Sequence, residues 1–241
     1  MESNYTKIGK LYLIPTTLGD TEPLEVLPLS VKKVIEELNV FIVENEKTAR
    51  RFIKQITPRK SQPSLNILKL DKYADQLEVR TYLDVCSTGV SVGLLSEAGV
   101  PAIADPGAEI VKLAHEKGIK VVPLVGPSSI ILAMMASGFN GQNFAFNGYL
   151  PIDASERKAA IKNLERLSKE KNQSQIFIET PYRNEKMLTD LKGTLTPTAK
   201  LCVACDITLQ SEYIKTLEIK DWKFEKPDLH KRPTIFIIHK E

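Results

Sequence analysis

Residues 94–129 read LLSEAGVPAIADPGAEIVKLAHEKGIKVVPLVGPSS, and their pattern is the strongest indication of the fold. The stretch starts at the end of an apolar run, and the small residues of segment 96–101, with one Gly and one Pro, end the strand. Asp105 and Pro106 predict the start of a helix, with Asp105 as the capping residue and Pro106 at the first helical position. Gly118 stands where that helix is expected to end. The stretch therefore predicts a strand, a loop and a helix.

The same order of elements then repeats. Residues 120–124 are apolar and β-branched, segment 126–129 is a second small-residue loop, and residues 130–136 predict a helix that ends near Gly138. Strands joined in this way by helices are normally parallel, so both loops are expected at the carboxyl edge of one sheet. Ligands bind at that edge in open α/β sheets. On spacing alone, a ligand site and plain connecting loops stay about equally open, and the pattern names no ligand.

Outside this stretch the alternation continues at first and then changes. Apolar runs and helical periodicity predict strands at 10–14, 40–43, 65–70 and 91–96, with helices at 28–38, 46–56 and 73–86. A charged helix is predicted at 155–171, with Ala160, Leu164 and Leu167 as its apolar stripe. Strands at 200–207, 212–219 and 234–239 lack long helices between them, which favours antiparallel pairs. We expect two domains, an α/β domain at 1–125 and an α+β domain at 126–241.

Composition bounds the class of protein. The 241 residues are 42% hydrophobic and 26% charged, which is ordinary for a globular protein. No apolar run reaches the roughly 18 residues that span a bilayer, and the N-terminus lacks the apolar region of a secretory signal. We therefore expect a cytoplasmic protein without a membrane partner. A net charge of +3 permits an RNA partner without demanding one.

The cysteines do not predict a metal site. Cys202 and Cys205 form a C-x-x-C inside the strand-like run LCVACDI, where their odd separation points the two side chains to opposite faces. No second Cys or His pair supplies further ligands. The prediction is that the chain has no metal centre.

The two loops of the opening stretch resemble motifs of a known family. SEAGVPAIADPG and VPLVGPSS are similar to S-D-A-G-T-P-x-I-S-D-P-G and P-G-P-S-A of the tetrapyrrole methylase superfamily, closest to its branch of ribosomal RNA small-subunit methyltransferase I. The segments LGD at 18–20, GYLP at 148–151 and ETPYR at 179–183, together with Glu44, extend the resemblance in order along the chain. It implies two α/β domains, an N-terminal parallel sheet with flanking helices and a C-terminal mixed sheet.

The resemblance also implies an activity. S-adenosylmethionine would bind in a cleft between the two domains, and its methyl group would pass to a cytidine ribose 2′-hydroxyl. The implied partner is ribosomal RNA or the small ribosomal subunit, and the implied assembly is a homodimer. Positions where relatives surround the cofactor correspond to Leu18, Val100, Pro101, Ile103, Pro127, Ser128, Ile178, Thr180, Ala204 and Thr234.

The candidate catalytic residues are acidic side chains in loops at strand ends. A ribose hydroxyl has a high pKa, so its proton needs a base, and Glu44, Glu97 and Glu179 lie where a carboxylate can serve. Asp105 lies in such a loop as well and is interpreted first as a helix cap. For Glu179, an ion pair with Arg183 and a contact with substrate stay equally open.

Departures from the family motifs leave two other functions open. Lys47 replaces the Arg of E-D-T-R, segment 205–212 retains Thr208 but loses the Glu and Lys of R-E-L-T-K-x-x-E, and segment 230–235 replaces the family's G-E-M-V-L. One alternative is a methyltransferase of the same fold that acts on a small molecule such as a tetrapyrrole. Another is a protein that binds the cofactor without turnover.

Overall fold

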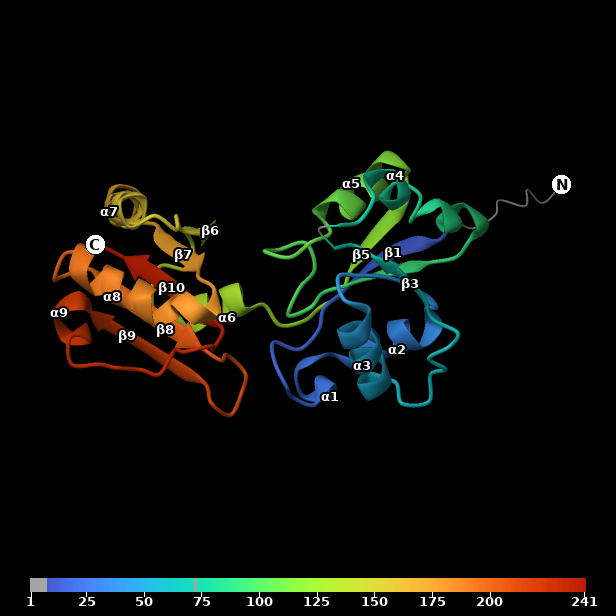
Figure 1. Cartoon of the computed structure of the whole chain (residues 1–241), viewed down its shortest axis with the longest axis horizontal. Coiled ribbons are helices and arrows are strands. Elements are labelled where there is room, and N and C mark those ends of the chain that lie inside the picture. Colours follow the sequence, from blue (N-terminus) through green and yellow to red (C-terminus); the bar gives the residue numbers. More distant parts are fainter. Residues whose placement is uncertain (1–7, 72) are drawn as a thin grey trace. The chain divides into compact units, whose positions relative to one another are not determined.

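The computed structural model describes residues 8–71 and 73–241 (Figure 1). The chain divides into two compact units, Met1–Pro127 and Ser128–Glu241. Each unit contains one five-stranded sheet, parallel in the first and mixed in the second. The predicted fold class, α/β with two such sheets, is confirmed.

The sheet of the first unit has the strand order β3-β2-β4-β1-β5, with parallel pairs throughout. Its strands are β1 (Lys10–Ile14), β2 (Val40–Val43), β3 (Asn66–Lys69), β4 (Val92–Leu95) and β5 (Lys120–Pro123). The helices between them are α1 (Pro23–Val26), α2 (Leu29–Glu37), α3 (Glu46–Ile56), α4 (Gln76–Val79) and α5 (Ala108–Glu116), with a 3-10 helix at Asp84–Thr88.

Alternate residues of the same strands pack into two separate hydrophobic clusters. Ile42 and Leu94 belong to a cluster with Ile110 of α5, whereas Phe41 and Leu95 belong to a second cluster with α2 and α3. Because side chains alternate along a strand, the two clusters lie on opposite faces of the sheet. Figure 1 shows α4 and α5 on one side of the strands and α2 and α3 on the other. Burial on both faces explains the continuous apolar runs in the sequence.

The helix predicted at 73–86 is wrong. Asp75 caps the short helix α4, and the chain then continues through turns into the 3-10 helix. Successive backbone bonds between residues three apart, Tyr82 N to Val79 O and Asp84 N to Thr81 O, tighten this segment. The Tyr82 hydroxyl donates to Lys69 O at 2.6 Å. The apolar spacing predicts an α-helix, but the segment winds more tightly and Tyr82 contacts β3.

The second unit has the order β6-β7-β10-β8-β9. Its strands are β6 (Phe144–Tyr149), β7 (Ser174–Ile178), β8 (Lys200–Cys205), β9 (Tyr213–Glu218) and β10 (Thr234–His239). β6 and β7 are parallel, and β10 is antiparallel to both β7 and β8. The helices are α6 (Ser129–Ser137), α7 (Ala154–Lys171), α8 (Asn184–Thr194) and α9 (Ile219–Trp222), with a 3-10 turn at Pro181–Arg183. β8 and β9, joined by a short connection, are also antiparallel, so the antiparallel pairs that the sequence predicts in this unit are confirmed.

The inward face of α7 differs from the predicted one. Its buried residues are Arg157, Ile161, Leu164 and Ser168, so the stripe is rotated from Ala160 and Leu167, which are half-buried. Arg157 sets the rotation, because its guanidinium donates twice to Asp190 Oδ2 of α8, at 2.8 and 2.7 Å. A buried Arg whose guanidinium has a carboxylate partner can face the core, although hydrophobicity alone would place it outside.

Two further findings concern membranes and metals. Across residues 8–71 and 73–241, no helix is both long and apolar enough to cross a membrane. The same residues hold no group of three or more His, Cys, Asp or Glu side chains arranged for a metal ion. Cys202 and Cys205 are buried thiols.

Candidate active site

Three loops at the carboxyl edge of the first sheet meet around Gly99. They follow β1, β4 and β5, which are neighbours in the sheet. Gly99 has φ +77°, and a Cβ added there would lie 3.1 Å from Leu18 Cδ2 and 3.2 Å from Pro127 O. Gly99 O also accepts the backbone N–H of Thr16 at 2.9 Å. The structure therefore brings Leu18, the Val100 loop and Pro127 together, as parallel strands require.

The loop after β4 is held in an uncommon conformation. Gly99, Ala102, Ala104 and Gly107 all have positive φ, at 77°, 65°, 55° and 124°. Alanine enters the left-handed region at a cost of about 1–2 kcal/mol per residue. Ile103, between the two alanines, is left 55% exposed. Strain of this kind at a loop apex is found where a ligand is held, and Pro101, which precedes it, is buried.

An acidic cluster lies at the same edge of the first sheet. Its members are Glu44 after β2, Asp71 after β3, Glu97 after β4, and Asp105. Burial, and then the negative charges of Asp105, Glu97 and Asp71, raise the pKa of Glu44. These carboxylates, Asp105 excepted, line a pocket of about 570 Å³. Carboxylates held together in this way are better proton acceptors than isolated ones.

Asp105 is not the helix cap that the sequence predicts. α5 begins at Ala108, and its N-cap is Gly107, at φ 124°. Leu94 Cδ2 would lie 2.6 Å from a Cβ at Gly107, so a side chain there would strain the backbone and require Leu94 to shift. Asp105 is half-buried, and burial raises its pKa, against the opposing effects of the Ser96 hydroxyl and the Glu97 amide. The left-handed loop turns the carboxylate away from the helix and into the acidic cluster.

Glu97 is fixed in place by α3. Thr48 Oγ1 lies 2.8 and 2.9 Å from the two carboxylate oxygens of Glu97 and donates to them. Glu97 also lines a second pocket of about 550 Å³, whose walls include Thr16, Leu18 and Phe52. One carboxylate thus borders two neighbouring pockets of the first unit.

The predicted cofactor residues of the second unit gather at one end of its central strands. Ile178 of β7 and Ala204 of β8 both pair with Ile235 of β10, and Thr234 precedes Ile235. Asn184, which is fully buried, donates to Thr234 Oγ1 at 3.1 Å and to Arg232 O at 2.6 Å. Among the described residues, Asn184 Oδ1 is a buried acceptor without a protein donor. A ligand that carries hydrogen-bond donors would complete it.

Glu179 differs from the other two candidate catalytic residues. Its Oε1 accepts from Thr180 N at 2.6 Å and from Arg183 Nε and Nη2 at 3.0 and 2.6 Å. The carboxylate is almost fully buried. The structure thus shows the ion pair with Arg183, and Thr180 shares the same oxygen. Ser128 is the N-cap residue of α6 and makes no side-chain capping bond there.

Three residues near these sites were missed in the sequence: Asp71, Thr48 and Asn184. Asp71 directly follows an expected parallel strand, so its place at the ligand edge could have been read from the strand order. Thr48 and Asn184 lie on helices, and nothing in their sequence context marks them. Their partners, Glu97 and Thr234, are 49 and 50 residues away.

Comparison with known proteins identifies related sequences. Residues 10–222 match the family described as Tetrapyrrole (Corrin/Porphyrin) Methylases. A protein of Vibrio cholerae serotype O1 named Ribosomal RNA small subunit methyltransferase I is 27% identical over 95% of this chain and 76% of its own length. A protein of the same name from Buchnera aphidicola subsp. Schizaphis graminum is 28% identical over 98% of this chain and 80% of its own.

Solved structures show the same fold at lower identity. The methyltransferase CobJ superposes with a TM-score of 0.64 at 16% identity, over 96% of this chain and 94% of its own. The cobalt precorrin-4 methyltransferase CbiF gives 0.60 at 18%, over 95% and 94%. A Thermus thermophilus uroporphyrin-III C-methyltransferase complexed with S-adenosyl homocysteine gives 0.56 at 15%, over 96% and 98%.

Proposed function

The chain belongs to the tetrapyrrole (corrin/porphyrin) methylase family, and from that premise we propose that it is an S-adenosylmethionine-dependent methyltransferase of small-subunit ribosomal RNA. The observation that carries the choice of RNA is the match to relatives named Ribosomal RNA small subunit methyltransferase I along 95% and 98% of this chain. The proposed acceptor is a cytidine ribose 2′-hydroxyl.

The residues present fit the cofactor. The Gly99 region offers a tight cradle, in which Leu18 Cδ2 and Pro127 O lie close to Gly99. In the second unit, the unpartnered Asn184 Oδ1 suits a ligand with hydroxyl or amino donors. We propose that the ten predicted positions hold S-adenosylmethionine, which supplies an activated methyl group on a positively charged sulfur when bound.

The chain itself must align the acceptor hydroxyl and accept its proton. Glu44 and Glu97 are the proposed catalytic side chains of the first unit, and Asp105 joins them. Burial and neighbouring negative charge raise the pKa of Glu44 and of Asp105, which makes both stronger bases than ordinary carboxylates. Thr48 keeps Glu97 in one orientation. Glu179 is proposed to act by holding Arg183 and the Thr180 backbone, since its charge is already paired.

A small-molecule acceptor is the second candidate. Lys47 provides a point charge where the family motif has the two-pronged Arg, and the acidic cluster would repel a phosphate group.

We further propose that the protein acts in the cytoplasm as a homodimer. The expected mass by sedimentation is then twice 27.0 kDa.

The test supplies radiolabelled S-adenosylmethionine, the chain, and small ribosomal subunits from a strain that lacks the gene. We expect label in the RNA, at one linkage that resists alkali, because a methylated 2′-oxygen cannot attack its phosphate. Label transferred to a porphyrinoid and not to RNA would replace the RNA function with the small-molecule one. Cofactor binding without transfer to either acceptor would leave a binding protein.

A further inference from the structure

Two departures from the family motifs meet in the second unit. Tyr182 stands where the motif E-S-P-H-R has a histidine, and His230 and Lys231 lie in the segment that replaces G-E-M-V-L. The backbone N–H of Lys231 donates to Pro181 O at 3.1 Å, which joins the two segments. Both departures therefore build one local surface.

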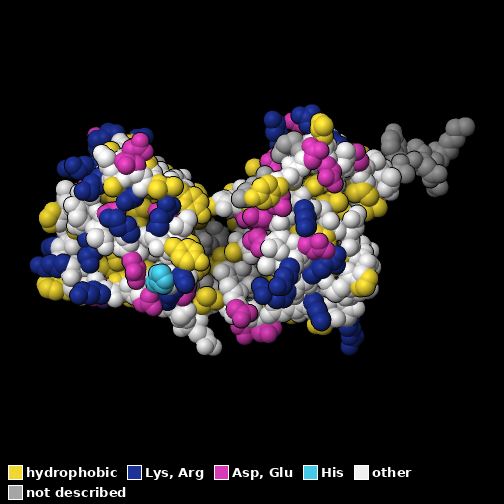
Figure 2. Space-filling view, in the orientation of Figure 1, with side chains coloured by type: hydrophobic (Ala, Val, Ile, Leu, Met, Phe, Trp, Pro, Cys, Tyr) yellow, Lys and Arg dark blue, Asp and Glu magenta, His cyan; other side chains and the backbone are white. Residues whose placement is uncertain are grey.

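The side chains of this surface surround an exposed ring. Tyr182 is 72% exposed. The Nζ atom of Lys231 lies 5.7 Å from the centroid of its ring, and the centroid of the His230 ring lies 6.4 Å away, with the two ring planes at 83°. We call Tyr182, His230 and Lys231 the aromatic–cation platform. Figure 2 shows a histidine at the surface of the second unit with hydrophobic, basic and acidic side chains around it.

The two arginines next to the platform form ion pairs within the protein. Arg183 pairs with Glu179, and Arg232 donates to Asp206 Oδ2 at 2.7 Å. Lys231 differs from both, since no ion pair with a described carboxylate is found for it. It also has φ 58°, a conformation that a lysine rarely adopts. The two arginines are held in ion pairs, whereas the cation of Lys231 lies over the Tyr182 ring and has no carboxylate partner among the described residues.

We propose that the aromatic–cation platform binds single-stranded RNA, with an unpaired base stacked on Tyr182 and a backbone phosphate beside Lys231. Exposed aromatic rings next to cations suit this partner, because every base offers a flat π-face and every nucleotide a negative charge. Tyr182 and Lys231 lie two and three residues from Thr180 and Thr234, which are predicted cofactor positions. A nucleotide held here would help to position the acceptor strand. The inference rests on the proposed RNA function and deepens it.

The binding test uses the full chain and a fluorescein-labelled single-stranded RNA of about twelve nucleotides. Tyr182→Ala should weaken binding roughly tenfold, within the range for loss of one base–aromatic stack, whereas Tyr182→Phe should bind as the wild type does. Lys231→Gln should lower the slope of log Kd against log salt by about 0.7, the value for one phosphate contact to a single strand.

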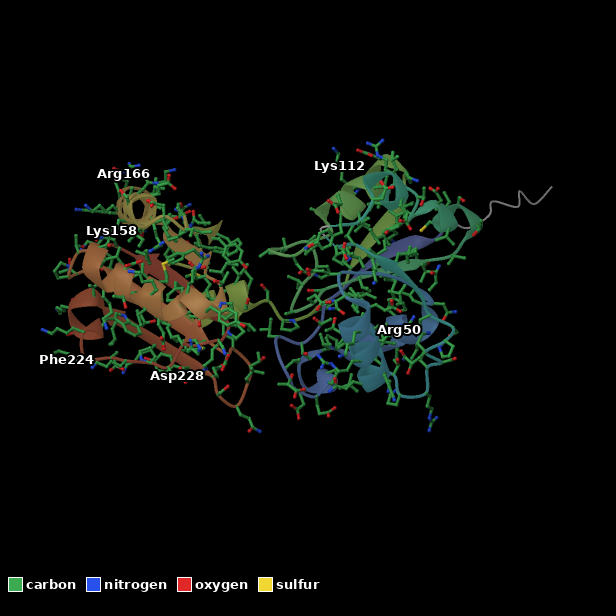
Figure 3. The ribbon with its side chains drawn as sticks, in the orientation of Figure 1. Arg50, Lys112, Lys158, Arg166, Phe224 and Asp228 are labelled. Atoms are coloured by element: carbon green, nitrogen blue, oxygen red, sulfur yellow. The ribbon has the colours of Figure 1, made fainter. Side chains whose placement is uncertain are left out.

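Phe224 provides a matched control. It is 77% exposed in the same unit, and Lys223 Nζ lies 4.7 Å from its ring centroid, so it is an aromatic–cation pair outside the platform (Figure 3). Phe224→Ala should leave RNA affinity unchanged. Equal losses in Phe224→Ala and Tyr182→Ala would overturn the inference, because binding would then be a property of the surface at large. So would wild-type affinity in Tyr182→Ala.

Two further measurements separate this inference from the proposed function. Calorimetry with S-adenosylmethionine should give the same affinity in Tyr182→Ala and wild type, and a weakened cofactor would assign Tyr182 to the cofactor site instead. Loss of binding to small ribosomal subunits without loss of binding to the free RNA would show a protein contact and contradict the platform. Failure of the wild type to methylate RNA refutes the proposed function, whereas the Tyr182 comparison refutes or supports the platform by itself.

Discussion

Single residues decide which acidic groups can take a proton. Asp105 and Glu44 come from different strand ends, yet burial and shared negative charge raise the pKa of both. Glu179 carries the same carboxyl group, but its negative charge is paired with Arg183. Chemical type alone therefore does not select a base, and the partners of each carboxylate do.

Glu97→Gln should lower the pKa of both Glu44 and Asp105. Burial would still raise the two values, but the mutation removes one of the negative charges that add to it. Carbon-detected NMR titration of the carboxyl groups measures this directly. Glu109→Gln is the control, because Glu109 lines the same pocket without contributing to either shift. Unchanged midpoints in Glu97→Gln would contradict the described cluster.

His239 should make the fold less stable in mild acid. It is 4% exposed, its ring stacks on Phe139 at 5.3 Å, and burial lowers its pKa. The unfolded chain binds the proton more readily, so the stability that the neutral ring contributes is present above about pH 6.5 and is lost as the pH falls below it. Urea unfolding at pH 7.5 and 5.5 should show a smaller loss in His239→Phe than in the wild type. His115→Gln, at an exposed position, should match the wild type.

At the scale of elements, the start of α5 depends on one glycine. Gly107 combines φ 124° with a position where an added Cβ would lie 2.6 Å from Leu94 Cδ2 and would push that side chain aside. Because α5 begins at Ala108 and not at Asp105, the loop after β4 includes Asp105 and the residues with positive φ. The geometry of the acidic cluster is thus set by where a helix begins.

Gly107→Ala should destabilise the chain more than Gly118→Ala. Both glycines have positive φ, but an added Cβ meets nothing within 4 Å at Gly118 and lies 2.6 Å from Leu94 Cδ2 at Gly107. Backbone strain alone costs about 1–2 kcal/mol, and crowding in a packed core adds about 1–3 kcal/mol. Denaturant unfolding of the two variants measures the difference. Equal losses would show that Leu94 moves aside freely.

At the scale of the whole molecule, each unit carries its own core. The hydrophobic cluster of the second unit contains buried residues between Leu150 and Ile238. The first unit has two clusters, one with residues between Leu11 and Ile119 and one with residues between Ile14 and Leu95. Sheet hydrogen bonds likewise stay within a unit. A self-contained sheet and core are what an independently folding domain needs.

Residues 128–241 should therefore fold when expressed alone. Trp222 is the only tryptophan of the chain, is fully buried, and donates from Nε1 to Leu201 O at 2.9 Å. Its emission should be blue-shifted and should change cooperatively in urea. A fragment of residues 140–241, which lacks α6 and the Thr216 bond to Ser137 O, should be less stable. Emission typical of exposed tryptophan from the longer fragment would contradict independent folding.

The sequence was enough to predict the two sheets and the strands at 10–14, 40–43 and 234–239, because apolar period and small-residue loops are local signals, and its motifs were enough to indicate the family. Three features depend on tertiary contacts: residues 73–86 wind more tightly than an α-helix, Arg157 orients α7, and α5 begins after Asp105. In each case a partner elsewhere in the chain supplies the deciding contact: Lys69 O for Tyr82, Asp190 for Arg157, and Leu94 beside Gly107 for the start of α5. Local patterns cannot contain such contacts, since the residues that make them are brought together only when the chain has folded.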